Sequence, residues 1–193
     1  PSMHIEHGKG FAERLATIKE TLTANGVKNI YTICPNCYVT LLEHTDFNVK
    51  SAWSFLDGHL PKESQDSLKG RVLSIHDPCP IVKDIEAAHH VRNILQQLGA
   101  EIVEFDKNRE NTMCCGKKNM IMALNPEKGK KIFHVRAKQL KTDEVATYCA
   151  ACVDSFRDHD FTAHHVLELV FQMNATTSWI NRYKAVGALK REV

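Results

Sequence analysis

The chain has 193 residues, of which 43% are hydrophobic and 25% charged, a globular composition that excludes disordered, collagen-like and fibrous proteins. Its 25 Lys and Arg against 23 Asp and Glu give a formal charge of +2 without a block of like charges, so nucleic acid is not an expected partner. No apolar run reaches the roughly 18 residues of a spanning helix, and no signal peptide is recognisable, so we expect a cytoplasmic protein without direct membrane insertion.

Helical and extended segments alternate along the chain. Apolar residues at three- and four-residue spacing, with Pro and Gly signals at the ends, predict helices over 11–24, 38–43, 49–60, 83–98, 126–140, 163–173 and 179–189. Short β-branched runs predict strands over 30–33, 71–75, 101–105 and 144–148. This alternation predicts an α/β fold in which a parallel sheet is flanked by helices in Rossmann-like layers.

Two segments of the chain are similar to each other. In both VKNIYTICPNCYVTL and EVATYCAACVDSF, a β-branched strand precedes C-x-x-C and a helix follows it, and the two motifs lie 115 positions apart. We infer a tandem repeat with an incomplete first copy, whose missing part is expected upstream in a longer parent. The predicted divisions are the end of the first repeat at 1–60, a linker at 61–70, the complete second repeat at 71–173 and a helical extension at 174–193.

Five of the seven cysteines follow the strands of the second repeat. They are Cys79 in HDPCP, Cys114 and Cys115 in CCG, and Cys149 and Cys152 in CAAC. Because loops at the carboxyl ends of parallel strands line one crevice, we expect the five thiols to converge there. Thiolates suit iron–sulfur clusters, zinc or copper(I). Five ligands exceed the four of a structural zinc site, which favours an iron–sulfur cluster, with zinc and metal-free thiol chemistry as alternatives.

Other residues near these motifs are candidates with weaker signals. Cys34 and Cys37 lack the CCG of their own repeat, so we expect them to be metal-free, disulfide-bonded or completed by another chain. A change at Cys34 is accordingly expected to leave the second site nearly untouched. His76 and Asp77 precede Cys79; His76 could move protons at a cluster, although such residues more often hydrogen-bond the turn.

The order HDPCP, CCG and C-x-x-C closely resembles the cysteine-rich CCG domain found in heterodisulfide reductase and in iron–sulfur subunits of glycolate oxidase, anaerobic glycerol-3-phosphate dehydrogenase and lactate-utilisation systems. The resemblance implies two tandem CCG repeats that hold [4Fe-4S]-type clusters, non-cubane in heterodisulfide reductase, where they cleave and reduce a disulfide. The implied ligands of the second cluster are Cys79, Cys114, Cys115, Cys149 and Cys152, and two implied ligands of the first are Cys34 and Cys37.

The same resemblance implies an iron–sulfur component of an oxidoreductase that carries electrons or reduces a disulfide or thiol substrate. Its expected partners are ferredoxin-like iron–sulfur or flavin subunits, and the chain alone is expected to be inactive. Two departures from the family are that Lys117-Lys118-Asn119 follows CCG and that the C-x-x-C-x-x-C-x-x-x-C-P run of the oxidase subunits is absent. The alternative is a non-catalytic module of a larger complex that binds zinc or another metal.

Overall fold

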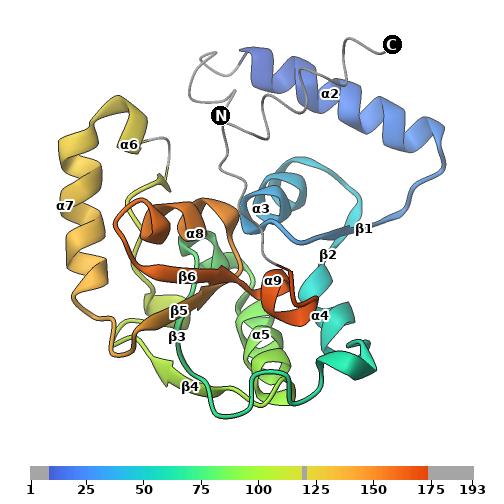
Figure 1. Cartoon of the computed structure of the whole chain (residues 1–193). Helices are drawn as coiled ribbons and strands as arrows, with labels where there is room; N and C mark the ends of the chain where they lie inside the picture. Colours follow the sequence, from blue (N-terminus) through green and yellow to red (C-terminus); the bar gives the residue numbers. More distant parts are fainter. Residues whose placement is uncertain (1–8, 119–120, 174–193) are drawn as a thin grey trace, which may run out of the picture.

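The computed structural model describes residues 9–118 and 121–173. Two parallel sheets organise this part of the chain, a two-stranded sheet in the order β1-β2 and a four-stranded sheet in the order β4-β3-β5-β6. Helices flank both sheets (Figure 1). The predicted α/β fold with parallel sheets flanked by helices is therefore confirmed. Within the described ranges, no helix combines the length and the apolar character needed to cross a bilayer.

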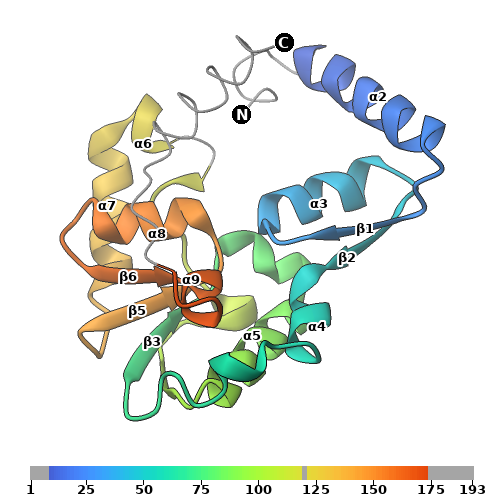
Figure 2. The same cartoon turned by 45° about the vertical axis from the view of Figure 1, so that its right-hand side comes forward.

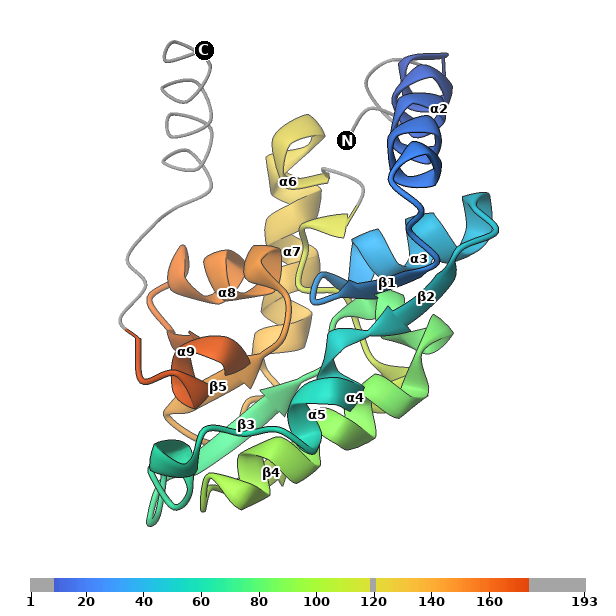
Figure 3. The same ribbon diagram turned by 90° about the vertical axis from the view of Figure 1, so that its right-hand side faces the viewer.

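The N-terminal elements form the smaller sheet and its helices. They are α2 (Lys9–Ala24), β1 (Asn29–Thr32), α3 (Pro35–His44), β2 (Asn48–Ser51) and α4 (Ala52–Asp57). Figure 3 shows α2 beside the two-stranded sheet and away from the four-stranded one. The helix predicted over 49–60 is wrong in its first part: Val49 and Ser51 are buried on alternate positions of a strand that pairs in parallel with β1, and the helix begins only at Ala52.

The larger sheet is built from the rest of the chain. Its elements are β3 (Val72–His76), α5 (Ile85–Gln97), β4 (Glu101–Glu104), α6 (Ile121–Leu124), α7 (Pro126–Ala137), β5 (Glu144–Thr147), α8 (Ala150–Arg157), β6 (Thr162–His165) and α9 (Val166–Val170), with 3-10 turns at Lys62–Ser64, Cys79–Lys83 and Arg109–Asn111. The helix predicted over 163–173 is wrong in its first part, because 162–165 pair in parallel with β5. The helix predicted over 179–189 lies outside the described residues.

Helices cover both faces of the four-stranded sheet. In Figure 2, α5 lies on one face, and α7 and α8 lie on the other. On the α5 face, Leu73 and Ile75 of β3 pack in the main core, which also contains Trp53 of α4. The Trp53 ring meets Tyr148 edge-on, with centroids 5.8 Å apart. The N-terminal elements and the larger sheet therefore share one core.

A second core of aromatic side chains lies on the opposite face. Phe105, Phe133 of α7 and Phe156 of α8 are fully buried there. The Phe133 and Phe156 rings meet edge-on with centroids 5.3 Å apart, and Phe156 lies at the same separation from the ring of His76. This core therefore forms an apolar floor beneath the last residue of β3.

The segment predicted as a linker, 61–70, packs against the end of α5. The backbone N–H of Asp66 donates to the carbonyl of Gln97 at 3.2 Å, and that of Leu68 donates to Leu98 at 2.7 Å. Gly99 has φ +85, and a Cβ there would lie 3.2 Å from the backbone of Asp66. Only glycine combines this backbone conformation with such a close approach at low cost.

Candidate metal centre

The cysteines of HDPCP, CCG and CAAC are placed by the ends of strands. Cys79 opens the 3-10 turn after β3, and Cys149 is the N-cap of α8 directly after β5, with Cys152 in the first turn of that helix. Cys114 and Cys115 arrive on the loop that follows β4 and the turn Arg109–Asn111. Because β3, β4 and β5 run parallel, their carboxyl ends and the loops after them meet at one edge of the sheet.

The five thiols form a continuous hydrogen-bonded series, which we call the thiol chain. Side-chain hydrogen bonds join Cys79 to Cys114, Cys114 to Cys115, Cys115 to Cys152 and Cys152 to Cys149. None of the five forms a disulfide. Cys115, Cys149 and Cys152 are buried, whereas Cys79 and Cys114 are half-buried and form the accessible end of the series. The structure thus brings together all five cysteines that the motifs single out.

Cys114 is the thiolate of this series. Hydrogen bonds from the thiols of Cys115 and Cys79 hold the pKa of Cys114 well below its ordinary value, although burial opposes this. The backbone N–H of Gly116 also donates to Cys114 Sγ at 3.3 Å. The bond to Cys114 in turn raises the pKa of Cys79 and, with burial, raises that of Cys115 to about 12. The protons of the raised thiols are those that a metal would displace.

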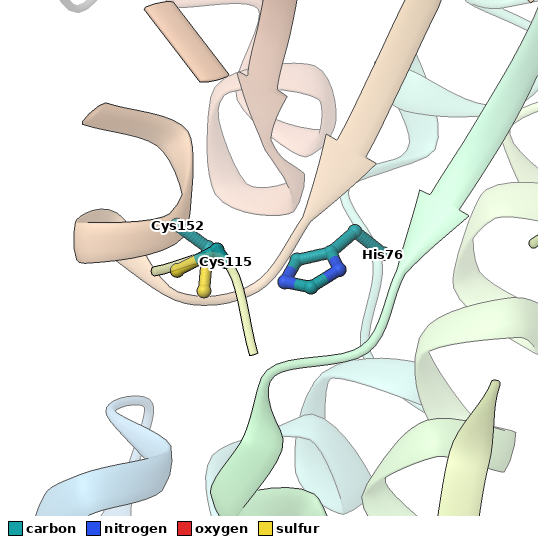
Figure 4. A group of neighbouring side chains, drawn as sticks. All are labelled: His76, Cys115 and Cys152. Carbon is teal, nitrogen blue, oxygen red and sulfur yellow. The ribbon is translucent and has the colours of Figure 1, made fainter. Parts of the chain in front are cut away.

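His76, the last residue of β3, lies beside the thiol chain. One ring nitrogen of His76 and the sulfurs of Cys115 and Cys152 lie within 4.8 Å of one another (Figure 4). The side chain is fully buried, and burial together with the charge of Arg136 lowers the pKa of His76 to about 3. Its Nδ1 accepts a hydrogen bond from Arg136 Nε at 2.8 Å, so its partner is on α7 and not in its own turn.

Asp77 does hydrogen-bond the surrounding turns. Its fully buried carboxylate accepts from Arg92 Nη1 and Nη2 at 3.0 and 2.8 Å, from Tyr148 Oη at 2.7 Å and from the backbone N–H of Arg109 at 2.7 Å. Burial alone would raise the pKa of Asp77, but the bonds and charge of Arg92 hold it below its ordinary value. Asp77 therefore ties together α5, the loop that leads to CCG, and the residue before Cys149.

Sequence reasoning missed the two arginines that support this centre. Arg92 and Arg136 are buried in α5 and α7. The signal for Arg92 was its position between Val91 and Ile94 on the apolar face of a predicted helix, where a charged residue needs a buried partner. Arg136 lies three residues after the buried Phe133, again at a core-facing spacing.

The two cysteines of CPNC, Cys34 and Cys37, are exposed and unbridged. Cys34 is the N-cap of α3, and a hydrogen bond from Cys37, aided by backbone N–H groups and opposed by burial, lowers the pKa of Cys34 to about 6. The pKa of Cys149 is lowered chiefly by its bond with Cys152, but a charge on Cys34 raises it. The charge of Cys34 therefore reaches one member of the thiol chain, Cys149, which the assignment of Cys34 to a separate repeat did not predict.

The donor set fits an iron–sulfur cluster. The thiol chain offers five sulfurs, one more than a tetrahedral zinc ion uses. Backbone N–H groups already donate to the sulfurs of Cys114 and Cys149, as they do to cluster ligands generally. His76 Nε2 is buried beside the sulfurs and has no hydrogen-bond partner among the residues that the structure describes.

Comparison with known proteins finds similarities for this part of the chain. Residues 73–157 match the family model of the CCG cysteine-rich domain, a range that includes every member of the thiol chain. A probable iron–sulfur-binding oxidoreductase, FadF of Bacillus subtilis (strain 168), is 26% identical over 148 residues, which are 69% of this chain and 21% of that relative. The chain thus spans about a fifth of the length of the curated relative that it matches.

Proposed function

We propose that residues 73–157, which match the family model of the CCG cysteine-rich domain, bind an iron–sulfur cluster. The proposed ligands are Cys79, Cys114, Cys115, Cys149 and Cys152. The observation that carries the proposal is the thiol chain, in which hydrogen bonds join five sulfurs from three strand ends. A cluster would take the place of the protons in these hydrogen bonds.

We further propose that the cluster is of the [4Fe-4S] type and that the chain is an electron-transferring component of an oxidoreductase. When bound, the cluster supplies one-electron redox chemistry. The similarity to a protein named as an iron–sulfur-binding oxidoreductase supports this general role. The accessible end of the thiol chain, Cys79 and Cys114, gives a route for electrons to a partner. Ferredoxin-like iron–sulfur or flavin subunits are the partners that such a role requires.

The finer proposal is a heterodisulfide-reductase-like reaction. One disulfide, two electrons from a partner subunit and two protons from solvent give two thiols, so the S–S bond is broken and the partner is oxidised. The chain's own residues hold the ligands for this reaction. Asp77 fixes the strand end before Cys79, and the aromatic floor formed by Phe105, Phe133 and Phe156 excludes water from the inner side of the site.

The second candidate is a non-catalytic metal-binding module. It is favoured by the compact group formed by His76, Cys115 and Cys152, whose ligand atoms lie within 4.8 Å of one another. Such a group, with one more thiolate, could hold a single zinc ion. The two candidates differ in metal, in sulfide content and in the presence of redox activity.

The deciding experiment is anaerobic reconstitution with ferrous iron and sulfide, followed by iron, sulfide and zinc analysis and by visible and electron paramagnetic resonance spectra. Iron and sulfide bound together, with a reducible signal, are the result that the proposal expects. A protein that retains zinc alone, without sulfide and without a redox signal, would contradict it and favour the second candidate. Parallel samples of Cys115→Ser and of Cys34→Ser test whether the bound metal uses the thiol chain.

A further inference from the structure

Arg136 is a buried cation whose hydrogen-bond partners are neutral. The side chain is fully buried in α7. Its Nε donates to His76 Nδ1 at 2.8 Å, and its Nη1 donates to the carbonyl of Lys107 at 2.6 Å and to Gln139 Oε1 at 3.2 Å. The guanidinium carbon lies 4.0 Å from the centroid of the Phe105 ring. Its Nη2 has no hydrogen-bond partner in the part of the chain that the structure describes.

A charge buried in this way needs a counter-charge. The acid that acts most strongly on Arg136 is Asp77, but its carboxylate is already bonded to Arg92. Cys152 and Cys115 favour the charged form of Arg136 when they are ionised, as they would be as cluster ligands. Burial lowers the pKa of Arg136 to about 10, which leaves the guanidinium charged at neutral pH.

The bond from Arg136 also fixes the protonation pattern of His76. A guanidinium N–H can only donate, so Nδ1 of His76 must be the acceptor and the single ring proton must lie on Nε2. Figure 4 shows the ring nitrogen remote from the side-chain attachment pointing toward Cys115 and Cys152. This Nε2–H group is a buried donor without a partner among the described residues. It faces the place where the proposed cluster would bring sulfur atoms.

We propose, on the basis of the function proposed above, that His76 donates its Nε2–H to a sulfur of the cluster bound at Cys115 and Cys152. Arg136 holds His76 in this tautomer and is the buried counter-charge of the negative cluster. His76 is then a tuning residue and not a metal ligand, because a protonated Nε2 has no lone pair to offer. A hydrogen-bond donor and a nearby positive charge both stabilise the more negative, reduced cluster. The pair therefore raises the reduction potential.

The first test is a redox titration of anaerobically reconstituted variants, followed by electron paramagnetic resonance. His76→Leu and Arg136→Met are expected to bind iron and sulfide as the wild type does but to be reduced at a lower potential. His76→Gln, whose amide retains a donor, is expected to restore part of the shift. Arg71→Gln is the matched control, because it removes one cation at the opposite end of β3, where Arg71 pairs with Glu144. Its potential should equal that of the wild type.

The coupling between the two residues gives a further readout. Since Arg136 acts partly by orienting His76, the double variant is expected to shift the potential by less than the sum of the single variants. Unchanged reduction potentials in cluster-loaded His76→Leu and Arg136→Met would overturn this inference but not the proposed function. Loss of iron from both His76→Leu and His76→Gln would make His76 a ligand and would also overturn it.

The second test uses the metal-free wild-type protein, so it depends neither on a bound cluster nor on the folding of an Arg136 variant. Nitrogen-15 NMR of histidine-labelled, metal-free protein under anaerobic conditions reads the tautomer directly, and a proton on Nε2 with a bare Nδ1 is expected for His76. A proton on Nδ1 would overturn the inference even if a cluster binds. Failure of the wild type to bind iron and sulfide would instead overturn the proposed function, and with it the donor role, whatever the tautomer.

Discussion

Thr32 and Thr147 occupy equivalent positions in the two similar strand–C-x-x-C–helix segments, each the last residue of a strand and two residues before the first cysteine of C-x-x-C. Both hydroxyl oxygens are buried and have no hydrogen-bond partner among the described residues. The strands that carry them, β1 and β5, lie 115 positions apart, the same offset as the cysteines. The correspondence thus extends from the motif to the burial of an individual hydroxyl group.

An unpartnered buried hydroxyl lowers the stability of the metal-free protein. Thr147→Val replaces it with a methyl group of similar shape, so we expect the free energy of unfolding to rise by about 1 kcal/mol in urea denaturation. The matched control is Ser155→Ala, which removes the hydroxyl that donates to the carbonyl of Cys115 at 2.6 Å. This variant should lose about 1 kcal/mol. Equal destabilisation of both variants would mean that Thr147 has a partner.

Cys115 is the link between the CCG pair and the C-x-x-C pair, because it bonds to both Cys114 and Cys152. We expect Cys115→Ser to bind less iron and sulfide after anaerobic reconstitution and to give a changed paramagnetic spectrum. Full iron content with an unchanged spectrum would contradict a five-thiolate cluster. A four-thiolate site made of Cys79, Cys114, Cys149 and Cys152 would then be the better account.

Cys34→Ser serves as the control for loss of one thiol. It should retain iron in the second site, but it removes a charge that raises the pKa of Cys149. A small spectral shift with full iron content is therefore the expected control result.

The two errors in the predicted fold fall at equivalent places. The helices predicted over 49–60 and 163–173 each begin as a strand, β2 or β6, and become helical only at α4 or α9. In each case a four-residue strand runs without a break into a helix, and the following helix supplies the apolar spacing that dominated the sequence pattern. The strands form because β1 and β5 offer them a parallel partner, which is a contact between distant elements that no local pattern contains.

The cysteines could be predicted because thiol chemistry is confined to one residue type and the motifs follow strand ends. The groups around them could not be predicted in the same way. Arg136 acts on the site through His76, 60 positions away, and Arg92 acts through Asp77, 15 positions away. These pairings depend on how α5 and α7 pack on opposite faces of the sheet. Periodicity shows that a helix has a buried face, but not which polar group that face meets.

Asp77 is expected to be a major source of stability. Asp77→Asn leaves Arg92 without its buried partner, so we expect the free energy of unfolding to fall by about 3 kcal/mol. Because the pKa of Asp77 is lowered in the folded state, its contribution is present above the ordinary pKa of aspartate and is lost as pH falls through the folded-state pKa. Urea denaturation at neutral and acidic pH should therefore show less acid sensitivity in Asp77→Asn than in the wild type.

A surface carboxylate provides the control for that variant. Asp106 pairs with Lys141 at 2.6 Å, but its side chain is 65% exposed. Asp106→Asn should change the free energy of unfolding by no more than about 0.5 kcal/mol. A similar loss in both variants would show that the network around Asp77 has no special part in stability.

Metal affinity should rise with pH. The pKa values of Cys79, Cys115 and Cys152 are raised in the metal-free protein, so these thiols are protonated at neutral pH and must release protons when they bind a metal. Each proton released changes the apparent affinity about tenfold per pH unit. Chelator competition with zinc as a probe, between weakly acidic and weakly alkaline pH, measures this slope. A pH-independent affinity would contradict the hydrogen-bonded description of the thiol chain.

Cys34 should be the most reactive cysteine of the metal-free protein, because it is exposed whereas the thiolate of Cys114 is half-buried. It is exposed, and its hydrogen bond from Cys37 lowers its pKa to about 6, so it is mostly thiolate at neutral pH. Iodoacetamide labelling followed by peptide mass analysis should find Cys34 modified first, with a rate that falls as pH drops below about 6.

Variants of Cys37 test the origin of this reactivity. Cys37→Ser replaces the thiol donor by a hydroxyl whose shorter reach weakens the bond, and Cys37→Ala removes the donor. In Cys37→Ala the neutral-pH rate at Cys34 should fall about tenfold or more, because its pKa returns toward the ordinary value of cysteine. An unchanged rate in that variant would assign the reactivity to the N-terminus of α3 alone, where backbone N–H groups also donate to Cys34.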